Sequence, residues 1–166
     1  MFQVKKLFLL IVLFAMGCAS KPETPIKAVY LVREAGQLSR EDLQTHPEVV
    51  VTDNFDTLKK IAQTKVAIWI DINAVDLVDL EWLSQSPQAL YPVVLVGNGD
   101  ETCSFFNTIH YFTFEMPCCL DCSSYPPGYS VNIQTDMSQG HMQGYEKTPT
   151  VQDILDITNP LLEQVK

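Results

Sequence analysis

The sequence predicts an α/β protein, a three-layer sandwich around a mainly parallel sheet of about five strands, with a Cys/Pro-rich loop and a C-terminal helix. Short apolar runs alternate along the chain with segments whose apolar residues recur at helical spacing. Two of these runs, residues 66–70 and 93–96, contain no polar residue. Such runs are typical of strands buried on both faces of a parallel sheet.

The first half of the domain shows strand and helix signals in regular alternation. Residues 28–32 and 49–52 are short runs of β-forming residues and are predicted to be the first two strands. Ser39 lies three residues before an Asp, which resembles a capping box, so a short helix is expected between these strands. Either Asp53 or Asn54 can cap the following helix, whose apolar residues recur at helical spacing.

The alternation continues to residue 114. Residues 66–70 and 93–96 are predicted to be the third and fourth strands, and a helix between them is expected to end near Pro87. Residues 102–108 are expected to form a short helix, and residues 109–114 a fifth strand. These elements complete the predicted sheet.

The pattern weakens in the last third of the chain. Residues 116–128 contain three prolines and three cysteines and are predicted to be a loop. Residues 129–133 are expected to add an edge strand, and residues 136–145 to be irregular. A final amphipathic helix begins near Val151, and Pro160 is expected to interrupt it or to start a last turn.

The N-terminus resembles the signal peptide of bacterial lipoprotein precursors. Lys5 and Lys6 precede an apolar core at residues 7–14, and the Ala-Met-Gly-Cys sequence that ends at Cys18 resembles a lipobox. The resemblance implies that residues 1–17 are removed and that Cys18 carries a lipid, so the protein is expected at a cell membrane, facing outside the cytoplasm. Simple secretion is the alternative, and a membrane-spanning helix fits less well because the apolar run is too short.

The remaining chain is predicted to contain a tether and one domain. Residues 18–27 include two prolines, which keep the segment extended, and residues 28–166 are long enough for a single domain with its own core.

The charge balance excludes one class of partner. Without Lys5 and Lys6 the chain has nine basic residues against twenty acidic ones, and no Lys or Arg occurs between residues 66 and 146. Because an acidic surface repels phosphate groups, nucleic acid is excluded as a partner. Cations, cationic peptides and neutral ligands remain compatible.

Residues 49–100 resemble the receiver domains of response regulators. Asp71 follows the third strand, where that family has its phosphoacceptor. The resemblance implies a flavodoxin-like topology only, because Val96 and Gly97 replace the expected Thr or Ser. The Lys that the family has after the fifth strand is also missing, since no Lys lies between Lys65 and Lys147. The sequence therefore assigns no functional family.

This topology also predicts where a ligand would bind. In open parallel sheets, sites form beyond the carboxyl ends of the strands. The carboxylate and amide side chains there could bind a divalent cation or a polyol. The residues are Glu34, Asp53, Asp71, Asn98, Asp100 and Glu115.

Four cysteines of the predicted domain, Cys103, Cys118, Cys119 and Cys122, form a second candidate site. Outside the cytoplasm, an even number of cysteines is most simply explained by two disulfides that hold the proline-rich loop. A zinc or copper site is the second interpretation, and a thiol redox pair at Cys119 and Cys122 is the third. The residues that could join a metal site are His110, His141, Met137 and Met142.

No nucleophile or catalytic triad stands out in the sequence. The protein is therefore expected to be a non-catalytic binding or interaction module for a protein or a small molecule, with no cofactor required. A cysteine-based metal or redox protein and an enzyme at the carboxylate edge are the alternatives.

Overall fold

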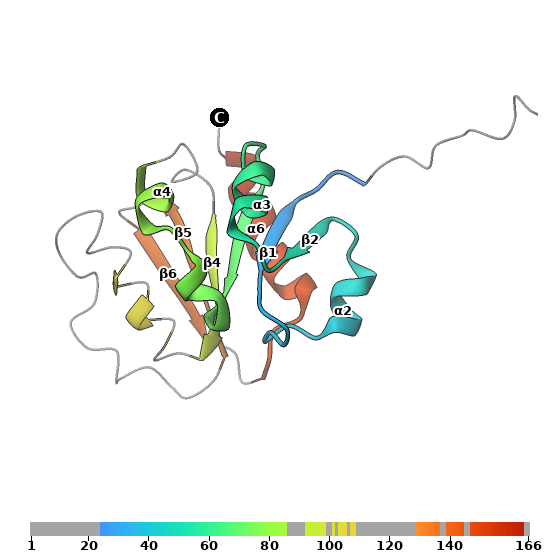
Figure 1. Ribbon diagram of the computed structural model, residues 1–166. Coiled ribbons are helices and arrows are strands. Elements are labelled where there is room, and N and C mark those ends of the chain that lie inside the picture. Colours follow the sequence, from blue (N-terminus) through green and yellow to red (C-terminus); the bar gives the residue numbers. More distant parts are fainter. Residues whose placement is uncertain are drawn as a thin grey trace, which may run out of the picture.

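One sheet organises the chain in the computed structural model, which describes residues 24–85, 92–98, 101, 103–105, 107–108, 129–136, 139–144 and 147–164 (Figure 1). Within these residues the sheet has six strands, in the order β2-β1-β3-β4-β5-β6. The first four are parallel, and β5 and β6 continue the sheet in antiparallel pairs. The strands are β1 (Ala28–Leu31), β2 (Val49–Thr52), β3 (Ala67–Asp71), β4 (Val93–Asn98), β5 (Tyr129–Asp136) and β6 (Gln139–Gly144).

The predicted α/β class with a mainly parallel sheet is confirmed, and its first four strands form where the sequence places them. The antiparallel end of the sheet differs from the prediction. Residues 139–144 form β6 instead of an irregular segment, so β5 lies inside the sheet and not at its edge. The sequence of β6, Gln-Gly-His-Met-Gln-Gly, has little strand propensity, so its pairing with β5 decides its conformation. The predicted strand 109–114 and loop 116–128 lie outside the described residues.

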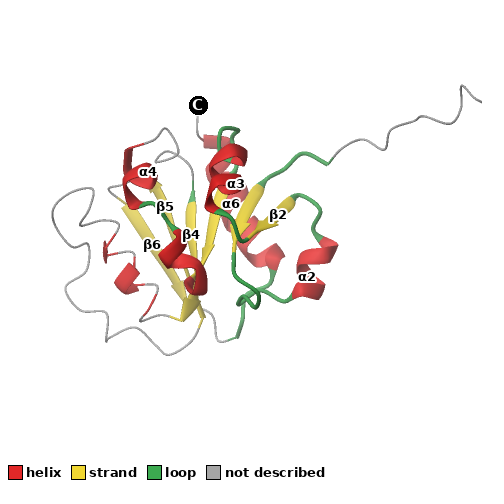
Figure 2. Cartoon of the chain, viewed as in Figure 1, coloured by secondary structure: helices red, strands yellow, loops and turns green. Residues whose placement is uncertain are grey.

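Helices pack on both faces of the sheet (Figure 2). One face carries α3 (Phe55–Ile61), the 3₁₀ helix η1 (Ile72–Leu77) and α4 (Leu80–Gln85). The other face carries α6 (Val151–Gln164), and Leu43 of α2 (Arg40–Thr45) packs against the same cluster. Alternate residues of β1, β3 and β4 therefore enter different cores, as the pleat of a strand requires.

The two cores contain the large side chains of the central strands. Leu31, Ile68 and Ile70 lie with Leu58 on the α3 face, and all four are fully buried. Tyr30 and Trp69 lie on the α6 face and meet edge to face, with ring centroids 6.4 Å apart. This double burial explains why the central strands lack polar residues up to Asp71.

Side-chain caps start the short helices. Ser39 Oγ accepts a hydrogen bond from the Asp42 amide at 3.0 Å, which confirms the predicted start of α2. Asn54, rather than Asp53, caps α3, because its Oδ1 accepts from the Thr57 amide at 2.9 Å. The single helix expected before Pro87 is two elements, η1 and α4, since Asp79 caps a new helix through the Trp82 amide.

Helix α6 continues through Pro160, where an interruption or a new turn was predicted. Proline removes one helical N–H group, but buried Ile154, Leu155 and Leu162 hold the helix against the sheet. Asp42 of α2 accepts a hydrogen bond from the Val151 amide at 2.7 Å, which joins the starts of the two helices.

The segment after β4 is described in part. Residues 101, 103–105 and 107–108 are helical, in agreement with the helix predicted for 102–108. Cys103 is fully buried and disulfide-bonded. No helix in the described ranges is long and apolar enough to cross a membrane.

Candidate functional site

Asp71, at the end of β3, is the only charged residue among the fully buried side chains of the described part of the chain. Its carboxylate accepts a short hydrogen bond from the Tyr30 hydroxyl. The backbone amide of Gln37 donates to the same oxygen, Oδ2, at 2.7 Å, and the backbone amide of Asn73 donates to Oδ1 at 3.0 Å. Both oxygens are therefore used inside the protein, and Asp71 has no face open to a ligand.

Tyr30 is held in its protonated form by this arrangement. Burial raises the pKa of Tyr30 far above its ordinary value, and the negative charge of Asp71 and the hydrogen bond to it add to the increase. The hydroxyl therefore acts as a permanent donor to the carboxylate.

Gly36 allows the loop after β1 to close over this pair. A Cβ atom at Gly36 would lie 2.7 Å from the Tyr30 hydroxyl and 2.9 Å from Asp71 Oδ2, closer than real contacts allow. Only glycine fits here without displacing buried groups.

These contacts fill the crevice where a parallel sheet usually binds its ligand. The chain leaves β1 for β2 on one side and returns to β3 on the other, so the topological switch point lies between β1 and β3. There Asn73 Oδ1 accepts from the Arg33 amide at 3.1 Å, and Arg33 Nη2 lies 2.5 Å from Asp76 Oδ2. The loops after β1 and β3 thus bond to each other across the switch point.

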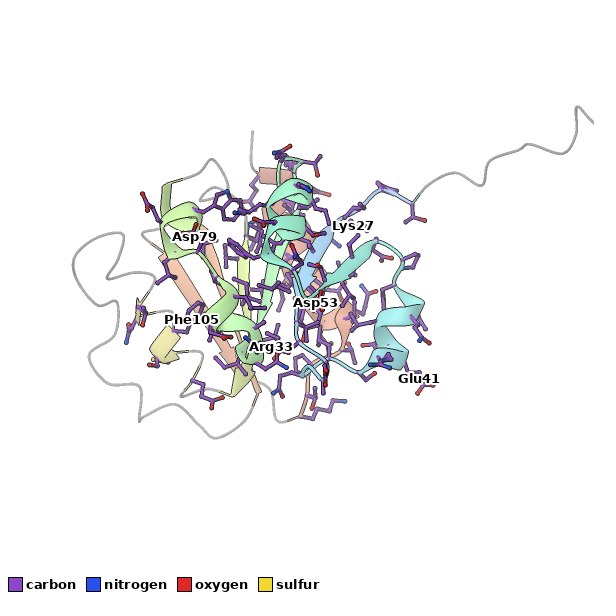
Figure 3. The ribbon with its side chains drawn as sticks, in the orientation of Figure 1. Lys27, Arg33, Glu41, Asp53, Asp79 and Phe105 are labelled. Carbon is purple, nitrogen blue, oxygen red and sulfur yellow. The ribbon has the colours of Figure 1, made fainter. Side chains whose placement is uncertain are left out.

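An open hollow of about 720 Å³ lies one strand further out, beyond the ends of β1 and β2. The loop after β1, helix α2 and the end of β2 form its walls. Figure 3 labels Arg33, Glu41 and Asp53 on these three elements. Its lining residues are Tyr30, Val32, Arg33, Glu34, Ala35, Gly36, Leu38, Ser39, Arg40, Leu43, Gln44, Val51, Thr52 and Asp53.

The hollow combines an apolar wall with charged groups at its rim. Arg33 is paired with Asp76, whereas Arg40, Glu34 and Asp53 are exposed and have no ion-pair partner among the described residues. Such a surface can bind a ligand that has both apolar and charged parts.

The structure separates the residues predicted at the carboxylate edge. Glu34 and Asp53 line the hollow, whereas Asp71 is buried beside the filled crevice. Asn98 ends β4, and only its backbone is described; Asp100 and Glu115 lie outside the described residues. No group of three or more His, Cys, Asp or Glu side chains that could hold a metal occurs in the described part of the chain.

Arg40, Leu43 and Val51 also line the hollow but were not predicted. In the sequence, Arg40 and Leu43 look like ordinary residues of a short surface helix, and Val51 looks like a residue of an interior strand. Nothing in the local sequence shows that Val51 lies at a sheet edge, so no signal could have identified it.

The cysteine site is described at one position. Cys103 is disulfide-bonded, while Cys118, Cys119 and Cys122 lie outside the described residues, as do His110 and Met137. His141 and Met142 are in β6, whose backbone alone is described.

No protein-family model, no curated protein and no solved structure matches this chain significantly. The geometry of the site therefore carries the functional argument.

Replacing Asp71 should weaken the whole domain. Asp71→Asn replaces one acceptor oxygen with an N–H₂ group, which leaves at least one of the three buried donors without an acceptor, and we expect it to lower the free energy of unfolding by about 3 kcal/mol. Urea unfolding followed by circular dichroism measures the loss. Asp76→Asn is the matched control, since it breaks an exposed ion pair and should lose less than about 1 kcal/mol. Equal losses in the two variants would contradict the structural role of Asp71.

The raised pKa of Tyr30 predicts a loss of stability in alkali. Tyrosine in the unfolded chain ionises near pH 10, while Tyr30 in the folded chain holds its proton to higher pH. Its contribution is therefore complete below pH 10 and decreases as the pH rises above that value. Urea midpoints of the wild type and Tyr30→Phe should differ by a constant amount below pH 10 and converge above it. Parallel curves throughout would show that Tyr30 ionises as easily as in the unfolded chain.

Proposed function

We propose that this protein is a non-catalytic binding module, held at the outer face of a cell membrane by a lipid on Cys18. The observation that carries the binding role is the open hollow beside β2, with unpaired Arg40, Glu34 and Asp53 at its rim. Charged groups that find no ion-pair partner in the described part of the domain are available for a ligand.

Rigid elements support a binding role for the hollow. Two of its lining residues, Val32 and Leu38, are part of the buried core. The loop after β1 is held in place by the hydrogen bond from the Gln37 backbone amide to Asp71. A site on such a frame is largely formed before the ligand arrives, which lowers the entropy lost on binding.

The geometry favours binding over catalysis at the carboxylate edge. An enzyme there would use Asp71, the residue that also matches the receiver phosphoacceptor, but its oxygens are buried and occupied. Glu34 and Asp53 are the carboxylates that remain open to a ligand. Together with the apolar wall of the hollow they can bind a ligand that carries a positive charge, without catalysing a reaction.

We propose that the described elements are part of one flavodoxin-like, three-layer domain spanning residues 28–166. The β2-β1-β3-β4 order of the parallel strands supports this, as do helices on both faces. The antiparallel strands β5 and β6 then replace the parallel fifth strand of that arrangement.

The proposed location depends on the N-terminal sequence, with residues 1–17 as the signal peptide and residues 18–27 as the tether. Residues 24–27 are exposed and lead into β1, which suits a link between a lipid and the domain. The disulfide at Cys103 also supports an oxidising compartment outside the cytoplasm.

We propose that the partner of Cys103 lies in the Cys/Pro-rich loop, at Cys118, Cys119 or Cys122. A cysteine in a disulfide has no thiolate to offer a metal, so Cys103 fits a structural role better than a zinc or copper site. Partners are proposed to be a protein or a small molecule, and the acidic charge disfavours nucleic acid.

Membrane attachment should depend on the thiol of Cys18. When the full chain is produced in a bacterium, we expect the wild type in the membrane fraction, with a mass that includes acyl chains. Cys18→Ala should remain unacylated because the acceptor sulfur is absent. Cys103→Ala is the control for a cysteine outside the lipobox and should still be acylated. An unmodified wild type, or acylation of Cys18→Ala, would overturn the proposed anchor.

Ligands should bind in the hollow, and a large side chain introduced there should prevent their binding. Saturation-transfer NMR with separate mixtures of free amino acids, monosaccharides and short peptides, on the full chain carrying Cys18→Ala, should show binding by at least one class. Val51→Trp places an indole in the hollow and should abolish the signal, whereas Thr57→Trp on exposed α3 should retain it. Absence of binding by every class, or binding unaffected by Val51→Trp, would refute the hollow as the site.

A further inference from the structure

We propose that the ligand of the hollow is an extended peptide, which adds as a strand to the outer edge of β2 and carries a basic side chain. This inference depends on the proposed binding function and specifies its partner. Three features of β2 and the hollow support it: the direction of the β2 backbone, the exposure of Val51 and the charges at the rim.

The backbone of β2 leaves hydrogen-bonding groups on its outer side. Within the described residues β2 is the outermost strand of the sheet, and only β1 pairs with it. The Glu48 and Thr52 carbonyls face β1: Glu48 accepts from the backbone amides of Lys27 and Ala28, and Thr52 accepts from the amide of Val32, just after β1. Because backbone groups in a parallel strand alternate in direction, Val50 also faces β1, and Val49 and Val51 face outward.

Val51 is the outward position that remains free. The Val49 amide donates to the His46 carbonyl at 3.0 Å within the preceding turn, whereas no other described residue donates to or accepts from the Val51 backbone. The Val51 N–H and C=O groups can therefore pair with an added strand.

The side chain of Val51 is exposed beside these groups. It is 46% exposed, and Ile26 is the only other large hydrophobic residue that is exposed in the described part of the chain. Natural edge strands are usually protected by a charge, a proline or a bulge, and β2, with the sequence Val-Val-Val-Thr, has none of them. Because β2 has only four residues, it needs little protection against unwanted strand pairing, and a partner can pair with it over only a few residues.

The hollow continues this free edge with a surface for side chains. Val51 and Leu43 supply apolar contacts, and Glu34 and Asp53 lie at the rim. Peptides that add to a sheet edge gain affinity from main-chain hydrogen bonds and specificity from pockets for alternate side chains. The free edge and the adjoining hollow provide both.

Charge selects a basic peptide. Arg33 is neutralised by Asp76, so the charges lining the hollow that have no ion-pair partner among the described residues are two carboxylates and Arg40. The chain as a whole carries twenty acidic against eleven basic residues, which attracts a cationic partner over long range. A lysine or arginine side chain of the peptide then lies against Glu34 and Asp53.

The test uses the full chain with Cys18→Ala and three synthetic peptides. All have alternating valine and threonine, and they differ in carrying lysines, glutamines or glutamates at matched positions. Isothermal titration calorimetry measures their affinities. The lysine peptide should bind tightest and the glutamate peptide weakest. Asp53→Asn and Glu34→Gln should each weaken binding of the lysine peptide about twofold to fivefold, and Arg40→Gln should leave it unchanged or strengthen it.

Strand addition is tested through the backbone. Val51→Pro removes the outward N–H group but none of the bonds to β1, so the domain should fold and lose the peptide. Two N-methylated peptides avoid any change in the protein. Methyl groups on one alternate set of amides should abolish binding, and methyl groups on the other set should be tolerated, because an added edge strand presents only one side to β2.

Each outcome bears on the proposal. Equal binding of the three peptides, tighter binding of the glutamate peptide, or equal tolerance of both methylation patterns would overturn it. If amino acids or monosaccharides occupy the hollow and peptides do not, the inference is wrong and the proposed binding function stands. If nothing binds, both are wrong.

Discussion

The structure depends on one buried carboxylate. An ionised side chain without partners inside a protein is strongly unfavourable, so Asp71 can lie at the end of β3 only if donors surround it. The Tyr30 hydroxyl and two backbone amides supply them. The need for these donors determines the path of the loop after β1, the absence of a side chain at Gly36 and the start of η1, which Asp71 caps through the Asn73 backbone amide.

The loops that supply hydrogen bonds to Asp71 cover the centre of the sheet, so the open hollow lies elsewhere. The loops after β1 and β3 close on each other at the topological switch point, where related topologies leave a crevice. The remaining hollow lies beside β2, where α2 is too short to cover the strand edge. A structural requirement at β3 thus leaves the sheet edge as the surface available for a partner.

Local sequence signals predicted elements whose cause is local. The capping residue Ser39, the apolar runs of β1 to β4 and the apolar spacing of α3 act within a few residues, and each of these elements forms as expected. The failures have distant causes. β6 forms because β5 lies beside it, and α6 passes Pro160 because its apolar face packs on the sheet. Propensity scales omit both effects.

The α/β class, the parallel central strands and the acidic charge could be predicted from the sequence alone, because they follow from periodicity and composition. The roles of the individual carboxylates depend instead on contacts between distant residues. Tyr30 and Asp71 are separated by 41 residues, and Arg40 and Val51 line one hollow from different elements. Burial and hydrogen bonding between such residues depend on how the loops close after the strands pair. Asp71 therefore became a structural acceptor, while Glu34 and Asp53 remained at the surface, although all three lie at or just beyond the carboxyl ends of parallel strands.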